Sequence, residues 1–187
     1  MPDSDLKHSN NLLILVGQEG SGKSTTVRAL LKETPSSAQI DAEDVAQLNP
    51  HAEMDPPFLR MMWKNVACLT RNFWEAGYHT VLAGSFLSNI GHYQGFREVL
   101  PDEANIYIVQ LCAGKPTRDV RRAERPKQST KEWWDMVDRV DPEDTTFAAT
   151  QGDFRFLRID NDGHSVSDTI DAIRAWVPEL YRDDVGH

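Results

Sequence analysis

A run of eight residues near the amino end of the chain has the composition and spacing of a phosphate-binding loop. It fits the pattern G-x-x-x-x-G-K-[ST] and reads Gly17-Gln18-Glu19-Gly20-Ser21-Gly22-Lys23-Ser24. Its glycines permit backbone angles that other residues avoid, so successive N–H groups can point inward at an anion. Lys23 is expected to reach the terminal phosphates of a nucleotide, and the Ser24 hydroxyl to bind Mg²⁺. We therefore expect ATP and Mg²⁺ to bind here.

The sequence on either side of this run supports the same interpretation. The apolar stretch 12–16 has the length of a buried strand, and residues 25–32 have the pattern of a helix. A helix that begins at the loop directs its positive amino end toward bound phosphates. Thr25 either supports the loop from below or continues the helix, and both roles remain open.

Three carboxylates follow the second expected strand, 38–41, in the segment Asp41-Ala42-Glu43-Asp44. They could accept a proton from a substrate hydroxyl or hold Mg²⁺ through water. Alternatively, Asp41 caps a helix that has Asp44 in its first turn. Many nucleotide-hydrolysing P-loop proteins carry an acidic residue at the end of the third strand, where this chain has Ala83. We therefore expect the metal-ordering carboxylate among residues 41–44.

Two arginines follow the fourth expected strand, 105–111, on a helix predicted over 116–124. Arg121 and Arg125 are four residues apart, so they share one helix face, and Pro126 then interrupts the helix. Phosphoryl transfer requires cations that neutralise the moving phosphate, and a mobile segment can deliver them as the site closes. We expect a lid over about residues 122–132. The alternative is a solvated basic helix that pairs with its own acidic residues.

Strands and helices alternate along the chain. A last strand is predicted over 154–159, after one at 79–83, and further helices over 55–76, 93–100 and 165–176. This alternation predicts an α/β fold with a parallel sheet covered on both faces, in which ligands bind at the carboxyl ends of the strands. We expect one domain over 1–187, with loose ends at 1–10 and 182–187.

Composition limits the classes of partner. The chain has 187 residues and a net charge of −9, which argues against general binding of nucleic acid or anionic membranes. The two cysteines, Cys68 and Cys112, lack metal-type spacing, and no apolar stretch approaches the about 20 residues of a membrane helix. A cytoplasmic protein is expected.

These residues together resemble the small P-loop kinases, which share the fold of nucleoside monophosphate, gluconate and shikimate kinases and include chloramphenicol phosphotransferase and zeta-toxin branches. The resemblance covers most of the chain. It rests on the Lys23 loop, on Arg121 with Arg125, and on residues 41–50, which are similar to the zeta-toxin pattern Asn-Ala-Asp-Glu followed by Leu-Asn-Pro.

The resemblance implies a three-layer sandwich with strand order 2-3-1-4-5 and a small lid. It also implies that Arg121 flanks adenine and that Arg125 contacts the transferred phosphate. The catalytic base would be Glu43 on the zeta-toxin match and Asp41 on the shikimate-kinase match, and this choice stays open.

The leading functional prediction is an ATP-dependent phosphotransferase that acts on a hydroxyl of a small molecule. Its acceptor pocket would be formed by the helix over 50–75 and the loop over 84–97. An ATP-binding regulator or slow NTPase is the first alternative, and a polynucleotide 5′-kinase is the second. The acceptor, the choice between ATP and GTP, and the oligomeric state stay open.

Overall fold

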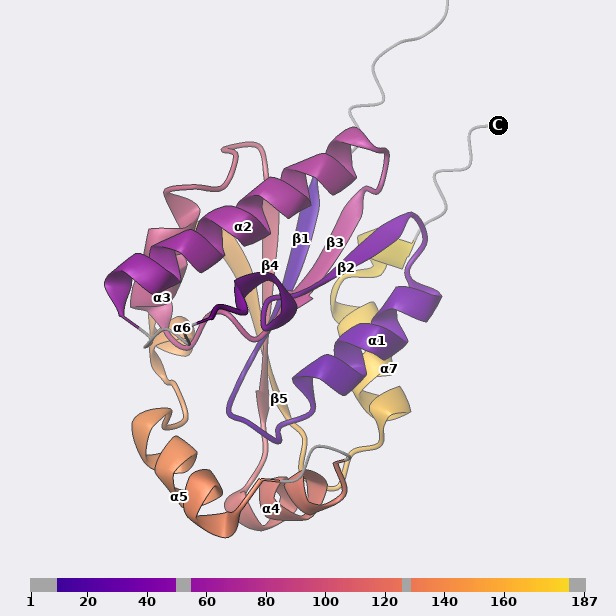
Figure 1. Ribbon diagram of the computed structural model, residues 1–187. Helices are drawn as coiled ribbons and strands as arrows, with labels where there is room; N and C mark the ends of the chain where they lie inside the picture. Colours follow the sequence, from indigo (N-terminus) through magenta and orange to yellow (C-terminus); the bar gives the residue numbers. More distant parts are fainter. Residues whose placement is uncertain (1–9, 50–54, 126–128, 182–187) are drawn as a thin grey trace, which may run out of the picture.

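A five-stranded parallel sheet forms the centre of the computed structural model, which describes residues 10–49, 55–125 and 129–181 (Figure 1). The strands are β1 (Asn11–Val16), β2 (Ser37–Asp41), β3 (Thr80–Gly84), β4 (Asn105–Cys112) and β5 (Phe154–Asp160). They lie in the order β2-β3-β1-β4-β5, and every neighbouring pair is parallel. In the central strand, Ile14 is in register with Ala83 and Ile108. The predicted α/β fold and its strand order are confirmed.

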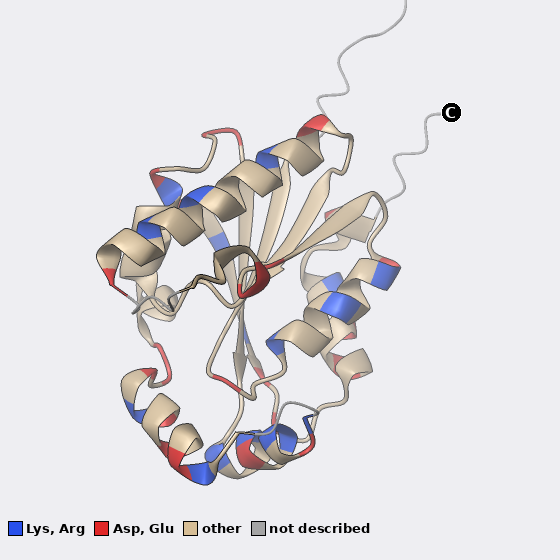
Figure 2. Ribbon diagram, in the orientation of Figure 1, with Lys and Arg blue, Asp and Glu red and all other residues tan. Residues whose placement is uncertain are grey.

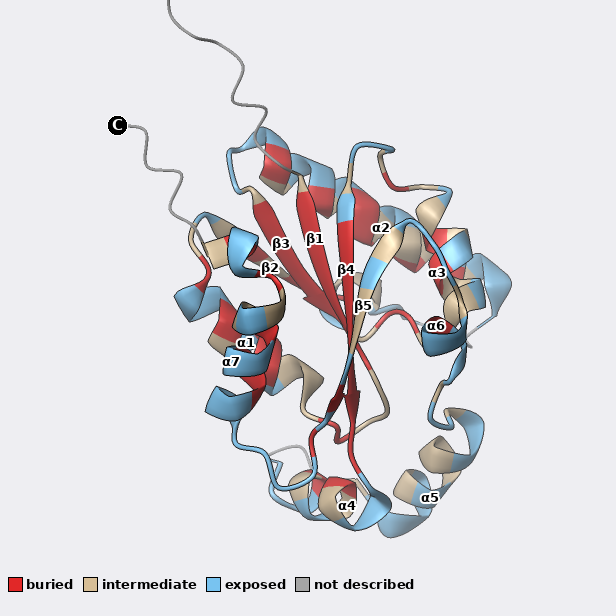
Figure 3. Ribbon diagram, turned by 180° about the vertical axis from the view of Figure 1, so that it is seen from behind, coloured by how far each residue is buried: buried red, intermediate tan, exposed pale blue. Residues whose placement is uncertain are grey.

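Helices cover both faces of the sheet (Figure 1). One face carries α2 (Pro56–Glu75), α3 (Ile90–Arg97) and α6 (Thr146–Ala149), and the other carries α1 (Lys23–Glu33) and α7 (Val166–Trp176). Alternate side chains of β1 enter the two cores, with Leu12 and Ile14 on the α2 side and Leu13 and Leu15 on the α1 side. Figure 3 shows that the buried residues concentrate in the strands and on the inner helix surfaces. The predicted three layers are therefore present.

Two helices stand beyond the carboxyl end of the sheet, next to the loop that follows β1. These are α4 (Lys115–Ala123) and α5 (Lys131–Val140), seen at the bottom of Figure 1. Figure 2 shows basic and acidic residues gathered along both of them. Two short 3₁₀ turns complete the fold, η1 (Asp44–Ala46) and η2 (Pro178–Tyr181).

The predicted boundaries agree with the observed ones to within two residues, except in α3. The pattern predicts this helix over 93–100, but it runs from Ile90 to Arg97. Its start is set by Asn89, whose side-chain oxygen accepts a hydrogen bond from the His92 backbone N–H at 3.0 Å. Its end is closed by the Arg97 guanidinium, which donates to the carbonyls of Leu100 and Pro101 at 3.2 and 3.1 Å. Both signals are polar, so the apolar spacing alone places the helix too late.

In the described part of the chain, none of the helices has both the length and the apolar character that crossing a membrane requires. Cys68 is exposed, Cys112 is buried, and both are free thiols. The expectation of loose ends falls almost wholly on residues 1–9 and 182–187, which lie outside the described residues, as do residues 126–128 of the predicted lid.

Candidate functional site

The phosphate-loop sequence forms a tight turn between β1 and α1. Gly17 has a φ of 133°, and a Cβ there would lie 2.3 Å from the Leu111 carbonyl oxygen at the end of β4. Gly22, directly before α1, has a φ of 108°, and a Cβ there would lie 3.1 Å from Asn161 Nδ2. A side chain at either position would therefore meet both backbone strain and a neighbouring group.

The Lys23 ammonium lies over this loop. Its Nζ donates to the carbonyl of Gly17 at 2.6 Å and to that of Gln18 at 3.1 Å. Burial lowers the pKa of Lys23 to about 8, and the carboxylates of Asp141 and Glu43 oppose this loss only in part. The loop therefore holds a cation whose charged form is disfavoured by burial and would be favoured by an arriving anion.

Ser24 and Asp41 lie against one small recess, together with Ser85. A hydroxyl and a carboxylate are ligands that suit Mg²⁺, which binds proteins through few groups and completes its shell with water and phosphate oxygens. No group of three or more His, Cys, Asp or Glu residues forms a metal-type cluster within the described ranges. Thr25 is exposed on the first turn of α1.

The other carboxylates after β2 have different surroundings. Asp41 Oδ1 accepts a hydrogen bond from the Glu43 backbone N–H at 3.2 Å, and the 3₁₀ turn that begins at Asp44 has no side-chain cap. The alternative expectation, in which Asp41 caps a helix, is therefore wrong. Glu43 is exposed and is close enough to Lys23 to raise its pKa. Asp44 is exposed and accepts a hydrogen bond from Gln47 at 3.5 Å.

Arg121 and Asn161 hold the loop from behind. The Ser21 carbonyl accepts hydrogen bonds from Asn161 Nδ2 at 2.7 Å and from Arg121 Nη1 at 3.2 Å. Asn161 is itself fixed, because its Oδ1 accepts from the Thr169 hydroxyl at 2.9 Å and its N–H donates to the Cys112 carbonyl at 2.6 Å. Asn161 lies in the turn that follows β5. It supports the phosphate loop, a contact that spans 140 positions of sequence.

Arg125 points at the same loop from the end of α4. Its Nη1 donates to Glu19 Oε1 at 3.1 Å. The other oxygen of Glu19 lies 3.7 Å from Nε of Arg122, whose side chain is 1% exposed. Neither of these two atoms has a hydrogen-bond partner in the described part of the chain. Glu19 therefore joins the phosphate loop to the end of α4, so Arg125 pairs with the loop instead of with its own helix.

A buried ion-pair network joins α4 to α5. Asp138 binds Arg122 Nη2 at 2.6 Å and also contacts the guanidinium of Arg118. Burial alone would raise the pKa of Asp138, but the two arginines hold it well below its usual range. Lys115 adds a surface bridge to Asp135 at 2.9 Å. No local sequence pattern points to Asp138, because helix spacing places it on α5 without indicating which cations it contacts.

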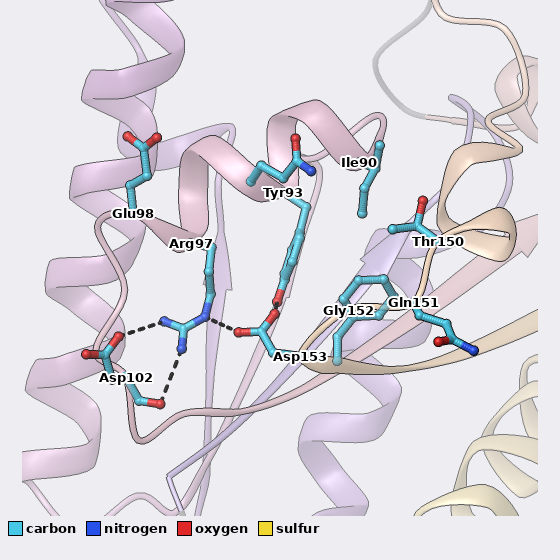
Figure 4. Close-up of a pocket in the computed structure, with 11 residues that line it drawn as sticks. Ile90, Tyr93, Arg97, Glu98, Asp102, Thr150, Gln151, Gly152 and Asp153 are labelled. Carbon is cyan, nitrogen blue, oxygen red and sulfur yellow. Dashed lines mark hydrogen bonds and ion pairs between the residues drawn. The ribbon is translucent and has the colours of Figure 1, made fainter.

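A second hollow of about 460 Å³ lies beside α3 (Figure 4). Tyr93 and Arg97 both point at Asp153 from its wall, and Arg97 also binds Asp102 at 3.7 Å. Burial and the hydrogen bond to Asp153 raise the pKa of Tyr93. These polar groups are already paired with one another, and the pairs join α3 to the residue before β5.

The sequence and the fold have known relatives. A family model described as an AAA domain matches residues 12–142. No curated protein matches the chain. An unliganded sugar kinase from Janibacter sp. HTCC2649 matches the structure with a TM-score of 0.69 and 14% identity, over 92% of this chain and 98% of that one.

Two further solved structures have the same architecture. A gluconokinase from Sinorhizobium meliloti 1021 has a TM-score of 0.63 and 11% identity, over 94% of this chain and 95% of its own. The Mycobacterium tuberculosis APS kinase in complex with AMPPNP and APS has a TM-score of 0.60 and 14% identity, over 90% of this chain and 97% of its own. The expected resemblance to the small P-loop kinases is confirmed, and at these identities the structural matches establish the fold.

Proposed function

This chain belongs to the AAA domain family, and from that premise we propose that it is an ATP-dependent phosphotransferase that acts on a hydroxyl of a small molecule. One observation carries the proposal. The Lys23 ammonium, the Ser24–Asp41 recess and Arg125 all gather around one loop. The sugar kinase, gluconokinase and APS kinase that share the fold support the same reaction class.

The nucleotide would be held by residues 17–25. Lys23 would exchange the carbonyls of Gly17 and Gln18 for phosphate oxygens. Arg121, fixed against the Ser21 carbonyl, would flank the base. Ser24 and Asp41 would hold Mg²⁺, directly or through water, and that ion would neutralise charge on the phosphates. These residues fit the ion because a hydroxyl and a carboxylate share one recess.

In the proposed step, the acceptor hydroxyl oxygen forms a bond to the γ-phosphorus of ATP. The bond from that phosphorus to the β–γ bridging oxygen breaks, and ADP leaves with the electron pair. The hydroxyl proton passes to a carboxylate, Asp41 or Glu43. Arg125 would leave Glu19 for the transferred phosphate, where its charge offsets the charge that develops. The predicted lid over 122–132 would close with it, and the whole chain would act as one domain.

A regulator or slow NTPase with water as its only acceptor is the alternative, and an acceptor-dependence assay separates the two. We expect a metabolite pool to raise ATP consumption above the water-only rate, Lys23→Ala to abolish transfer, and Arg125→Ala to lower turnover while sparing ATP affinity. Arg174→Ala is the matched control, because it removes a surface arginine on the far helix α7. Normal turnover in both site variants would refute the proposal.

A further inference from the structure

Three polar residues form a wall beside the phosphate loop: Ser88, His92 and Asp141. Asp141 directly follows α5, and its backbone carbonyl accepts a hydrogen bond from the Gln18 side chain at 3.0 Å. The Ile90 backbone N–H donates to the Thr146 hydroxyl at 3.0 Å, which ties the start of α3 to the segment after Asp141. These two bonds place Asp141 between the phosphate loop and the first turn of α3.

The polar groups on this wall have unused hydrogen-bonding capacity. The Asp141 carboxylate faces Lys23, the Ser88 hydroxyl and His92. His92 Nδ1 is buried and has no hydrogen-bond partner among the residues that the structure describes. Burial lowers the pKa of His92 and so favours the neutral imidazole, a form that offers one donor and one acceptor. A carboxylate, a hydroxyl and a neutral imidazole together suit a ligand that can both donate and accept hydrogen bonds.

An aromatic side chain supports the histidine. The Trp63 ring lies 5.8 Å from the His92 ring, centroid to centroid, and comes from α2. A Cβ on Gly95 would lie 2.3 Å from Trp63, so the indole packs against the bare backbone of α3. Its Nε1 donates to the Phe86 carbonyl at 3.4 Å. The wall therefore has a fixed apolar base under its polar groups, as a small-molecule site requires.

The charge of the wall limits the ligand class. Burial raises the pKa of the Asp141 carboxylate, and the charges of Lys23 and Arg118 act to lower it. Both cations already have other partners: Lys23 binds the phosphate loop, and Arg118 binds Asp138. Arg97, on α3 itself, is bound to acidic and carbonyl groups at the far end of that helix (Figure 4). A carboxylate or phosphate on the acceptor would thus meet the Asp141 carboxylate, while Lys23, Arg118 and Arg97 are each bound to another group.

We propose that Ser88, His92 and Asp141 bind the hydroxyl groups of an uncharged polyol, such as a neutral sugar or cyclitol, and so define the class of phosphoryl acceptor. This rests on the proposed function, since the polyol would be the acceptor of that reaction. The Asp141 carboxylate would accept hydrogen bonds from neighbouring hydroxyls, while Ser88 and His92 would each accept or donate one.

The test uses the full chain with Mg²⁺-ATP and two matched panels of acceptors. One panel holds neutral aldoses, alditols and inositols, and the other holds the corresponding aldonic acids, uronic acids and sugar phosphates. Transfer is measured as the mass gain of one phosphoryl group. We expect at least one neutral polyol to be phosphorylated, with kcat/KM at least about 100-fold above that of its acidic counterpart.

Three variants test the wall itself. Asp141→Asn should lower kcat/KM for the neutral acceptor by about 10- to 100-fold, mainly through KM, and should reduce the discrimination against the acidic acceptor. Ser88→Ala should raise the KM for the neutral acceptor by a smaller factor. Asp171 is a surface carboxylate on α7, and Asp171→Asn should leave kcat/KM unchanged for both acceptors. If Asp141 had only a structural role, its substitution would lower kcat/KM equally for the neutral and the acidic acceptor.

The outcomes separate this inference from the function beneath it. Preferred phosphorylation of acidic or phosphorylated acceptors would overturn the polyol assignment and leave the kinase proposal intact. Unchanged discrimination in Asp141→Asn would also overturn the assignment of the wall. No transfer to any compound, with only water-dependent ATP hydrolysis, would refute the kinase proposal and the inference with it.

Discussion

Nucleotide binding should take up a proton at alkaline pH, and Lys23 is the reason. In the free protein, burial lowers the pKa of Lys23 from 10.5 to about 8, so its ammonium becomes neutral as the pH rises past 8. Bound phosphates favour the charged form and should raise the pKa again. Above pH 8 the free protein must gain a proton in order to bind, so affinity falls as the pH rises.

The size of the effect can be worked from the same pKa. At pH 9 about one tenth of the free protein carries a charged Lys23, so ATP affinity should be roughly tenfold weaker than below pH 8. Binding at pH 9 should take up about 0.9 proton, compared with about 0.1 at pH 7. Calorimetric titration with Mg²⁺-ATP in buffers of different ionisation enthalpy measures this number.

Lys23→Arg provides the control, because arginine stays protonated throughout this range. This variant should bind more weakly at pH 7, owing to its altered geometry, but should lose no further affinity between pH 8 and 9. Equal pH dependence in Lys23→Arg and the unmodified protein, or no proton uptake at pH 9, would refute the assignment of the effect to Lys23.

Three further substitutions test the supports of the loop. Asn161→Ala leaves the Ser21 carbonyl without its 2.7 Å bond, and thermal unfolding should show a loss of about 1–3 kcal/mol together with weaker ATP binding. Asp138→Asn removes the carboxylate that Arg118 and Arg122 share, so urea unfolding should show a loss of about 3–5 kcal/mol, and a loss below about 1 kcal/mol would contradict the network. Glu19→Gln removes a negative charge beside the phosphates and frees Arg125, so ATP titration should show severalfold tighter binding, whereas weaker binding would count against this role.

The parts of the site that can be predicted from sequence are those that a local pattern specifies. The conformation of the loop from Gly17 to Ser24 depends on its own glycines and on the strand and helix beside it. A local sequence pattern is therefore enough to predict it. The strands β1, β3 and β4 are equally clear, because each is a short and mostly apolar run, whereas β2 and β5 include polar residues. Even so, the sequence placed α3 too late, since its start depends on the Asn89 cap rather than on apolar spacing.

The parts that could not be predicted depend on contacts between distant segments. Asn161 supports the loop from 140 positions away, and Asp138 meets arginines on another helix. Asp141 reaches the loop through a bond to Gln18 that spans 123 positions. Each is one polar residue in a segment with many, so nothing local distinguishes it. A turn such as Asp160-Asn161-Asp162 is an ordinary loop by composition, and only the packed sheet makes its asparagine a support.

The most direct test of the proposed phosphotransferase activity follows the γ-phosphoryl group itself. ATP labelled at the γ-phosphate would be incubated with Mg²⁺, the full chain and a panel of neutral polyols, and the label would be divided between inorganic phosphate and organic phosphate esters. The proposed kinase activity predicts that label appears in an ester, that this depends on one acceptor, and that it is lost in Lys23→Ala. Label that appears only as inorganic phosphate, at a rate independent of every acceptor, would contradict it.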